Sequence, residues 1–247
     1  MTSILTRIKH GDGVVELSLN RAPVNALSAE LLMSFAREIN AMSQDPEVKA
    51  IVLSSPFKVF SAGLDLKEAQ RFNLSQQHAI VEGLNVGFLS LFACPKPTIC
   101  ALNGAAIAGG LFFVLAADFR VAAPQAKLGL AEVRVGASFP VGPMEIARAT
   151  LDPNTLRRLM LTGQPMDAET AHRVGVIDEI DPDVLVRAVR EAKAMAQIPP
   201  RTYATVKQQI RGGTISLIEQ EIAGGANAPV GGWFNEETKA AMKRMIG

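Results

Sequence analysis

Short apolar runs separated by glycine and polar residues dominate the first half of the chain, and they predict β-strands. Residues 3–9 and 13–19 alternate or run apolar around the segment from His10 to Gly13. This pattern is typical of a strand, a tight turn and a second strand. Three further apolar runs have the length of buried strands, and they are residues 50–54, 98–102 and 119–122.

Helical spacing appears between these predicted strands. After Ser28, apolar residues recur every three or four positions, as a helix with one buried face requires, and these residues are Leu31, Leu32, Phe35, Ile39 and Met42. A second helix is predicted at about residues 75–92, and a buried apolar helix at 109–117. Strands that alternate with helices favour an α/β class over separate all-β and all-α parts.

Beyond about residue 143 the predicted strands stop and helices follow one another. Four helical patterns are visible there, at residues 157–161, 168–173, 184–195 and 202–210. Pro199 and Pro200 separate the last two, because proline interrupts a helix, and a final amphipathic helix begins at about Asn235. We therefore expect one domain over residues 1–247, with about 1–180 as its core and about 181–247 as a helical C-terminal extension.

The composition is that of a folded protein with balanced charge. Apolar residues make up 48% and charged residues 20% of the chain, which argues against disorder. A net charge of +1 with 5% aromatic residues argues against nucleic-acid binding. No apolar run reaches the ~18 residues of a membrane span, and no apolar signal core is visible. We expect a cytoplasmic protein with neither a membrane nor a nucleic-acid partner.

Cysteine, histidine and serine chemistry has little support in the sequence. Cys94 and Cys100 form neither a CxxC pair nor a metal cluster, so we expect two packed thiols. Nucleotide-phosphate loops are absent, and Ser138 lacks the second glycine of a G-x-S-x-G elbow. Surface or local hydrogen-bonding roles, rather than metal ligation, are expected for the three histidines, His10, His78 and His172.

Two glycine-containing segments, residues 60–66 (Phe-Ser-Ala-Gly-Leu-Asp-Leu) and 103–110 (Asn-Gly-Ala-Ala-Ile-Ala-Gly-Gly), carry more specific chemistry. Gly109 and Gly110 lie at the predicted start of a helix, where unpaired N–H donors carry partial positive charge. A carbonyl oxygen that becomes an enolate would be stabilised there. Close packing of a helix on a strand also demands glycine, so spacing alone leaves ligand binding and packing open.

Three motifs, at residues 60–68, 103–110 and 128–136, together resemble the crotonase (enoyl-CoA hydratase/isomerase) superfamily. The resemblance runs in order from about residue 14 to residue 178. It implies an α/β fold, the ClpP-like crotonase spiral of ββα turns with a C-terminal helical region. It also implies an acyl-CoA thioester substrate, a homotrimer or dimer of trimers, and an enolate held by two backbone N–H groups.

The resemblance assigns roles to individual residues by motif position. The two N–H groups that hold the thioester oxygen would belong to Leu64 and Gly109. The backbone near Ala62 would contact adenine. Lys67 falls where it can approach the CoA phosphates, although a solvated lysine at a helix start explains it equally well. No metal and no cofactor is implied beyond the CoA of the substrate itself.

The chain departs from the hydratase pattern at one position. Hydratases of this superfamily carry one glutamate soon after the glycine run and a second in the later motif, whereas this chain has Phe112 and then Glu132. Hydration needs paired carboxylates to hold and activate water, but one base can move a proton from C2 to C4 of a 3-enoyl thioester. The sequence is therefore similar to the mitochondrial-type Δ3,Δ2-enoyl-CoA isomerase branch, with Glu132 as sole proton shuttle.

The likeness to that branch includes Leu64, residues 23–28 (Pro-Val-Asn-Ala-Leu-Ser) and Pro140. Substrate-contacting apolar walls are expected from Phe112, Phe139 and Pro140, and the two phenyl rings would raise the pKa of the nearby glutamate. Two alternatives stay open. One is another crotonase-type acyl-CoA reaction, such as hydration, thioester hydrolysis or decarboxylation, and the other is a non-catalytic acyl-CoA-binding protein.

Overall fold

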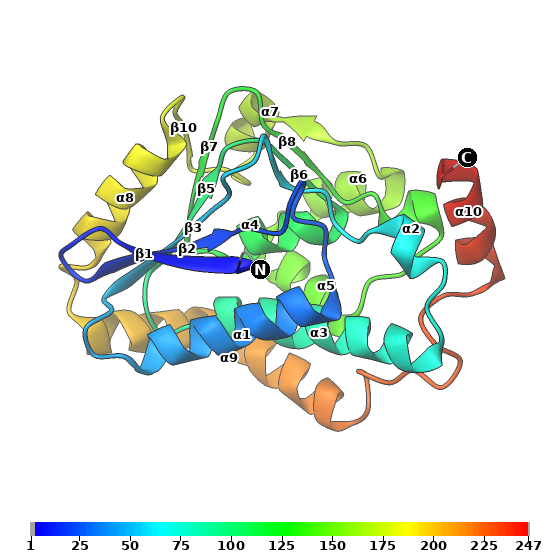
Figure 1. Ribbon diagram of the computed structural model, residues 1–247. Coiled ribbons are helices and arrows are strands. Elements are labelled where there is room, and N and C mark those ends of the chain that lie inside the picture. Colours follow the sequence, from blue (N-terminus) through cyan, green and yellow to red (C-terminus); the bar gives the residue numbers. More distant parts are fainter. Residues whose placement is uncertain (1–2, 247) are drawn as a thin grey trace.

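The computed structural model describes residues 3–246, with side chains described up to Arg244. Strands alternate with helices, so the predicted α/β class is confirmed (Figure 1). The strands are β1 (Leu5–Lys9), β2 (Val14–Leu19), β3 (Ala50–Ser54), β4 (Val59–Ser61), β5 (Thr98–Leu102), β6 (Ala105–Ile107), β7 (Phe119–Ala122), β8 (Lys127–Gly129), β9 (Met166–Asp167) and β10 (Glu179–Ile180). The helices are α1 (Ala29–Gln44), α2 (Leu66–Ala69), α3 (Leu74–Phe92), α4 (Phe112–Ala116), α5 (Val141–Thr150), α6 (Pro153–Thr162), α7 (Ala168–Arg173), α8 (Val184–Met195), α9 (Pro200–Ala223) and α10 (Glu236–Ile246), with 3-10 helices η1 (Ala108–Leu111) and η2 (Glu132–Val135).

The strands form two sheets that the chain visits in turn. The larger sheet has six strands in the order β1-β2-β3-β5-β7-β10, and the smaller has four in the order β4-β6-β8-β9. The pairs β3–β4, β5–β6 and β7–β8 each pass from the larger sheet to the smaller one and are followed by helical structure. Each pair advances one position in both sheets. This repeat is the spiral of ββα turns that the sequence predicted.

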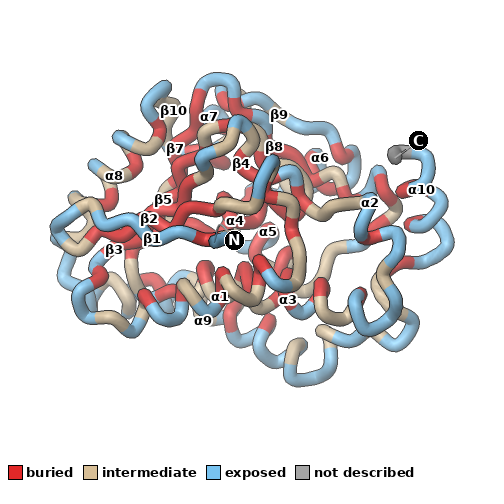
Figure 2. Tube along the Cα trace, viewed as in Figure 1, coloured by how far each residue is buried: buried red, intermediate tan, exposed pale blue. Residues whose placement is uncertain are grey.

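Helices bury both faces of the larger sheet. On one face, the edge-on rings of Phe35 in α1 and Phe88 in α3 contact Phe113 of α4, with centroids 4.9 and 5.0 Å apart. On the other face, Ala188 of α8 packs with Val52 of β3. Parallel strands covered on both sides read as continuous apolar runs, which explains why β3 and β5 were predicted correctly. Figure 2 shows the buried residues concentrated in these strands.

Two predictions about secondary structure were wrong. Strands do occur after residue 143, because β9 pairs with β8 and β10 pairs with β7. Each has only two residues, too few for a local pattern, and distant partners define them. The apolar stretch 109–117 is also not one helix, since η1 precedes α4. By contrast, Ser28 accepts a hydrogen bond from the Leu31 N–H and caps α1 as predicted.

The predicted local roles of the cysteines and histidines are confirmed. Both thiols are free and buried. Each histidine ring makes a local or loop contact, with the Glu16 carboxylate, the Pro229 carbonyl and the Ile177 carbonyl as partners.

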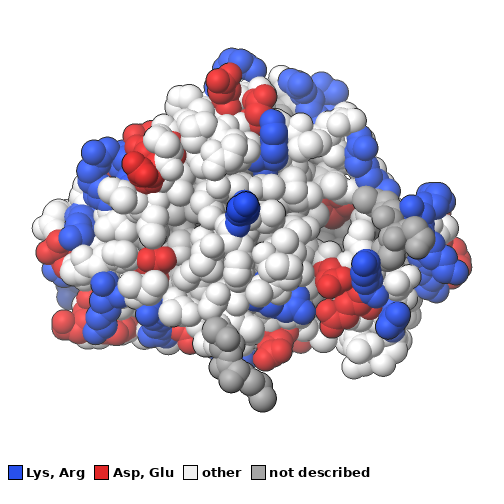
Figure 3. Space-filling model, turned by 45° about the horizontal axis from the view of Figure 1, so that its top comes forward, with Lys and Arg blue, Asp and Glu red and all other residues white. Residues whose placement is uncertain are grey.

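Basic and acidic side chains are interspersed on the face in Figure 3. Within residues 3–246, no helix has the length and apolar character needed to cross a membrane.

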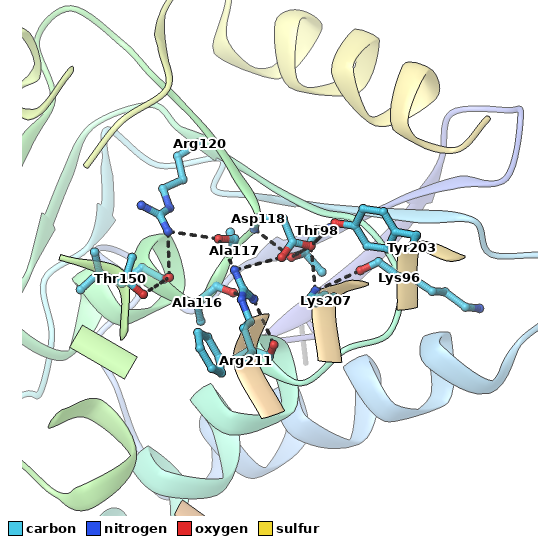
Figure 4. Close-up of polar contacts among 12 residues, drawn as sticks. Lys96, Thr98, Ala116, Ala117, Asp118, Arg120, Thr150, Tyr203, Lys207 and Arg211 are labelled. Carbon is cyan, nitrogen blue, oxygen red and sulfur yellow. Dashed lines mark hydrogen bonds and ion pairs between the residues drawn. The ribbon is translucent and has the colours of Figure 1, made fainter. Parts of the chain in front are cut away.

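Helix α9 is fixed to the sheet by a buried carboxylate, Asp118 (Figure 4). Its side chain accepts hydrogen bonds from Lys207 Nζ at 2.7 Å and Tyr203 OH at 2.8 Å, and it forms an ion pair with Arg211 at 3.0 Å. The backbone N–H and hydroxyl of Thr98 also donate to it, each at 2.9 Å. Only 7% of Lys207 is exposed, and its burial lowers the pKa of the ammonium group. One carboxylate therefore balances two cations in the interior.

Asp118→Asn tests this interpretation. The change leaves Lys207 and Arg211 buried without their countercharge, so we expect the free energy of unfolding to fall by about 3–5 kcal/mol. The matched control is Asp12→Asn, which breaks an exposed ion pair with Lys193 and should change it by less than about 1 kcal/mol. Urea titrations of both variants measure the difference. Equal effects would contradict a structural role for the Asp118 cluster.

Candidate active site

The fold brings the two glycine-containing segments into direct contact. Gly63 has a left-handed backbone with φ +76°, and a Cβ built on it would lie 2.7 Å from the Ile107 carbonyl oxygen and 3.4 Å from the Gly109 nitrogen. An alanine at this position would therefore meet both backbone strain and a clash. Because the segments touch here, Leu64 and Gly109 line the same cavity.

Neither of the predicted N–H donors has a backbone partner among the described residues, although Leu64 stands in an isolated parallel β-bridge with Leu27. The Leu64 N–H has no hydrogen-bond partner among the described residues. Gly109 is the second residue of η1, ahead of the first N–H that i→i+3 bonding can satisfy. Ala108 precedes it with φ +51°, a left-handed conformation that non-glycine residues seldom adopt. Two unpaired amides at one cavity can hold an oxygen that carries negative charge.

Residues 23–28 hold this backbone arrangement in place through hydrogen bonds. The buried Asn25 donates from Nδ2 to the Phe60 carbonyl at 2.8 Å, and the Ser61 hydroxyl donates to the Asn25 carbonyl at 2.8 Å. The Leu27 N–H donates to the Gly63 carbonyl at 2.8 Å. The segment that the sequence linked to the isomerase branch therefore fixes the strand end before Leu64.

The cavity has a volume of about 160 Å³. Seven of the eight predicted site residues line it, and they are Ala62, Leu64, Gly109, Phe112, Glu132, Phe139 and Pro140. The eighth, Lys67, is exposed on α2 and lies outside the cavity, in a separate polar depression with Arg71. The Ala62 N–H is already bonded to the Val24 carbonyl at 3.0 Å, so only its carbonyl oxygen is available to a ligand.

Glu132 is the one ionisable side chain among the described residues that line the cavity. It begins η2, which ends at Gly136 in a left-handed conformation. The side chain is 7% exposed, and its Oε2 has no hydrogen-bond partner among the described residues. Burial among apolar groups raises the pKa of this carboxyl to about 8. The predicted rise in its pKa therefore agrees with the geometry.

Phe112 supplies an apolar wall of the cavity. Its ring packs against Phe139 with centroids 6.2 Å apart, and against Phe88 at 5.5 Å. The side chain is 1% exposed. It offers neither a proton donor nor an acceptor to the cavity.

Part of the cavity wall was missed in the sequence. Trp233, Phe234 and Met242 line it from the C-terminal part of the chain, beyond the region where the motifs lie. The one available signal was an aromatic pair directly after a stretch rich in glycine and alanine. Leu27 and Leu84 also line the cavity, from elements that were predicted only as helix or motif.

Comparisons with known proteins show which family this chain resembles. A putative enoyl-CoA hydratase from Thermus thermophilus is 34% identical over 176 residues, which cover 70% of this chain and 68% of that protein. Mitochondrial methylglutaconyl-CoA hydratase from Mus musculus is 32% identical over 180 residues, which cover 70% of this chain and 57% of that protein. The match thus spans little more than half of the mouse protein.

The solved structure of human mitochondrial delta3-delta2-enoyl-CoA isomerase has a TM-score of 0.92 with this chain. The superposition covers 99% of this chain and 97% of the human one at 23% identity, so the likeness is one of fold. The family model for enoyl-CoA hydratase/isomerase matches residues 9–227. That match takes in both glycine segments and Glu132, and the chain therefore belongs to the enoyl-CoA hydratase/isomerase family of the crotonase superfamily.

Proposed function

We propose that this enzyme moves the double bond of a 3-enoyl-CoA to the 2 position. The observation that carries the proposal is the single carboxyl group, Glu132, among the described residues of an otherwise apolar cavity. Double-bond migration needs one group that takes and returns a proton. Hydration needs in addition a water molecule that is held and activated, and Phe112 cannot do this.

In the proposed reaction, the Glu132 carboxylate removes a proton from C2 of the substrate. The electron pair of that C–H bond moves towards the thioester carbonyl, whose oxygen becomes negative and is held by the N–H groups of Leu64 and Gly109. Glu132, now a carboxylic acid, returns the proton to C4, where the electron pair of the C3–C4 double bond forms the new C–H bond. The pair held on the oxygen returns to restore the carbonyl, and the new double bond forms between C2 and C3. Loss of one such N–H donor typically costs ~2.7–4 kcal/mol of transition-state stabilisation. No cofactor enters this sequence.

The CoA part of the substrate would lie outside the cavity, whose volume suits only an acyl segment. The free carbonyl of Ala62 at the rim is our candidate contact for adenine. Lys67, exposed on α2 beside this rim segment, is our candidate contact for the CoA phosphates.

A second candidate function is hydration of a 2-enoyl-CoA, which the hydratase names of the relatives favour. Thioester hydrolysis and decarboxylation use the same amide pair, and a protein that binds acyl-CoA without reaction would also keep the cavity. These alternatives differ in product. Offering 2-enoyl-CoA and malonyl-type thioesters, and following exchange of C2 protons with deuterated solvent, separates them.

The Glu132→Gln variant tests the proton shuttle. We expect purified protein to convert a 3-enoyl-CoA to the conjugated 2-enoyl product, and the variant to lose about 10²–10⁴-fold in kcat because an amide cannot transfer the proton. Absorbance of the conjugated thioester measures both rates. Glu30→Gln, at an exposed position in the first turn of α1, is the control and should keep full activity. Full activity of Glu132→Gln would contradict the proposal.

The raised pKa of Glu132 predicts a pH-dependent stability. Between about pH 5 and pH 8 the native carboxyl keeps its proton, whereas the unfolded carboxyl releases it near its ordinary pKa. The unfolded state then binds fewer protons, so the free energy of unfolding should decrease as the pH rises through this window. Glu132→Gln has no carboxyl proton to lose, so its free energy of unfolding lacks this pH dependence. Urea titrations should show its stability rising relative to that of the native protein as the pH rises. A pH-independent difference would place the pKa of Glu132 near its usual value.

We further propose that the chain assembles as a homotrimer or dimer of trimers. Val206, Ile210 and Leu217 lie along α9 with helical spacing and are 45%, 77% and 41% exposed, and such an apolar stripe is typical of a protein interface. Sedimentation equilibrium should give a mass that is a multiple of three 26.3-kDa chains. Ile210→Glu should lower that mass, whereas Glu219→Gln on the same helix should not. A native protein of single-chain mass would refute the assembly.

A further inference from the structure

One wall of the cavity is supplied by the C-terminal segment, which we name the roof and define as Trp233, Phe234 and Met242. The rings of Trp233 and Phe234 stack with centroids 5.0 Å apart. Trp233 Nε1 donates to the Ser138 carbonyl at 3.0 Å, and Met242 of α10 is 1% exposed. In Figure 1, α10 lies beside α2, far from the preceding helix α9. Trp233 and Phe234 therefore reach the cavity on the segment between α9 and α10, which forms neither a helix nor a strand.

The side chain of Gln77 in α3 holds the backbone of Trp233 and Phe234 in this roof. Its Oε1 accepts hydrogen bonds from the N–H groups of Trp233 at 2.9 Å and Phe234 at 3.0 Å. Its Nε2 donates to the Phe72 carbonyl at 3.2 Å. Gln77 is only 8% exposed, and buried side-chain amides are as a rule hydrogen-bonded. The Gln77 carboxamide thus accepts the backbone hydrogen bonds that Trp233 and Phe234 would otherwise donate to a neighbouring strand.

The volume of the cavity limits the length of the acyl chain that can fit beneath the roof. Its volume of about 160 Å³ is close to that of an engineered apolar cavity of about 150 Å³ that binds benzene, a six-carbon ring. Sites for drug-sized ligands are larger, at about 300–1,000 Å³. A longer acyl chain would have to displace the roof or the packed rings of Phe112 and Phe139, and protein interiors yield little to added volume.

We infer that the roof, held by Gln77, restricts the site to short acyl chains of about four to six carbons. The inference rests on the proposed acyl-CoA function and names the substrate class within it. Gln77 is a positioning residue here, because it acts through Trp233 and Phe234 and does not touch the cavity. The one polar group among the roof side chains, Trp233 Nε1, already donates to the Ser138 carbonyl, so the roof has no polar group left for a charged or hydroxylated chain end, and the fitting substrate is a plain hydrocarbon acyl group.

Trp233 is the one tryptophan of the chain, so its fluorescence reports directly on the roof. Saturated butanoyl-, hexanoyl-, decanoyl- and hexadecanoyl-CoA bind without reacting, and titrations followed by Trp233 emission and by calorimetry measure their affinities. We expect hexanoyl-CoA to bind most tightly and hexadecanoyl-CoA about ten-fold or more weakly. Ten-fold corresponds to about 1.4 kcal/mol.

Variants then separate the role of Gln77 from general stability. Gln77→Leu removes the acceptor of the two N–H groups, so we expect the Trp233 emission to shift to the red. We also expect the ratio of the affinities for hexanoyl- and hexadecanoyl-CoA to fall towards one. Gln77→Glu keeps acceptor oxygens for the two N–H groups and should retain the ratio. Gln44→Leu, at the exposed end of α1, is the matched control. Should Gln77→Leu not fold, Met242→Ala shortens a roof side chain and must lower the ratio in the same way.

The outcomes distinguish this inference from the function on which it rests. Equal affinity of the native protein for hexanoyl- and hexadecanoyl-CoA overturns the length limit and leaves the acyl-CoA function standing. Binding seen by calorimetry without a change in Trp233 emission overturns the placement of the roof at the ligand. Absence of binding for every acyl-CoA overturns both. An unchanged ratio in folded Gln77→Leu and Met242→Ala overturns the role of the roof.

Discussion

The close approach of the two glycine segments is the constraint on which the rest of the site depends. At Gly63 there is room for no Cβ, because the Ile107 carbonyl oxygen would lie 2.7 Å from it. Sheet pairing holds one of these segments and the hydrogen bonds of Asn25 and Leu27 hold the other. The positions of the Leu64 and Gly109 amides therefore follow from the backbone of the fold. Donors fixed in this way need no reorganisation when charge develops on a bound oxygen.

The buried carboxyl of Glu132 places a second demand on the fold. A carboxyl group without a polar partner is tolerated in an apolar cavity because it can stay protonated, and burial shifts its pKa accordingly. Its position is set by the 3-10 helix that ends at Gly136, whose carbonyl accepts a hydrogen bond from the buried Thr238 hydroxyl at 2.6 Å. Helix α10 thus contributes twice, since Thr238 steadies the segment that carries Glu132 while Met242 lines the cavity.

The sequence predicted those parts of the molecule whose structure is encoded locally. The buried strands, the capped and periodic helix α1, and the motif residues Leu64, Gly109 and Glu132 all follow from short stretches of chain. What it missed is defined by distant partners. Two-residue strands such as β9 have no pattern of their own, and Lys207 falls in an ordinary helical run that does not reveal its partner Asp118. Nor does any local feature indicate that Gln77 contacts residues 156 and 157 positions further on.

The apolar lining of the cavity and its number of carboxyl groups are linked. In an apolar enclosure a second carboxylate beside Glu132 would raise the free energy of both ionised forms, because neither desolvation nor mutual repulsion would be offset. A site with two carboxylates therefore needs water or polar partners, and these would also supply the nucleophile for hydration. Phe112 adds neither a second carboxylate nor a polar partner for water, while the apolar walls shift the pKa of Glu132 towards the range in which one group can both take and return a proton. The apolar lining thus accords with the proposed isomerisation, which needs one proton-transferring group, better than with hydration.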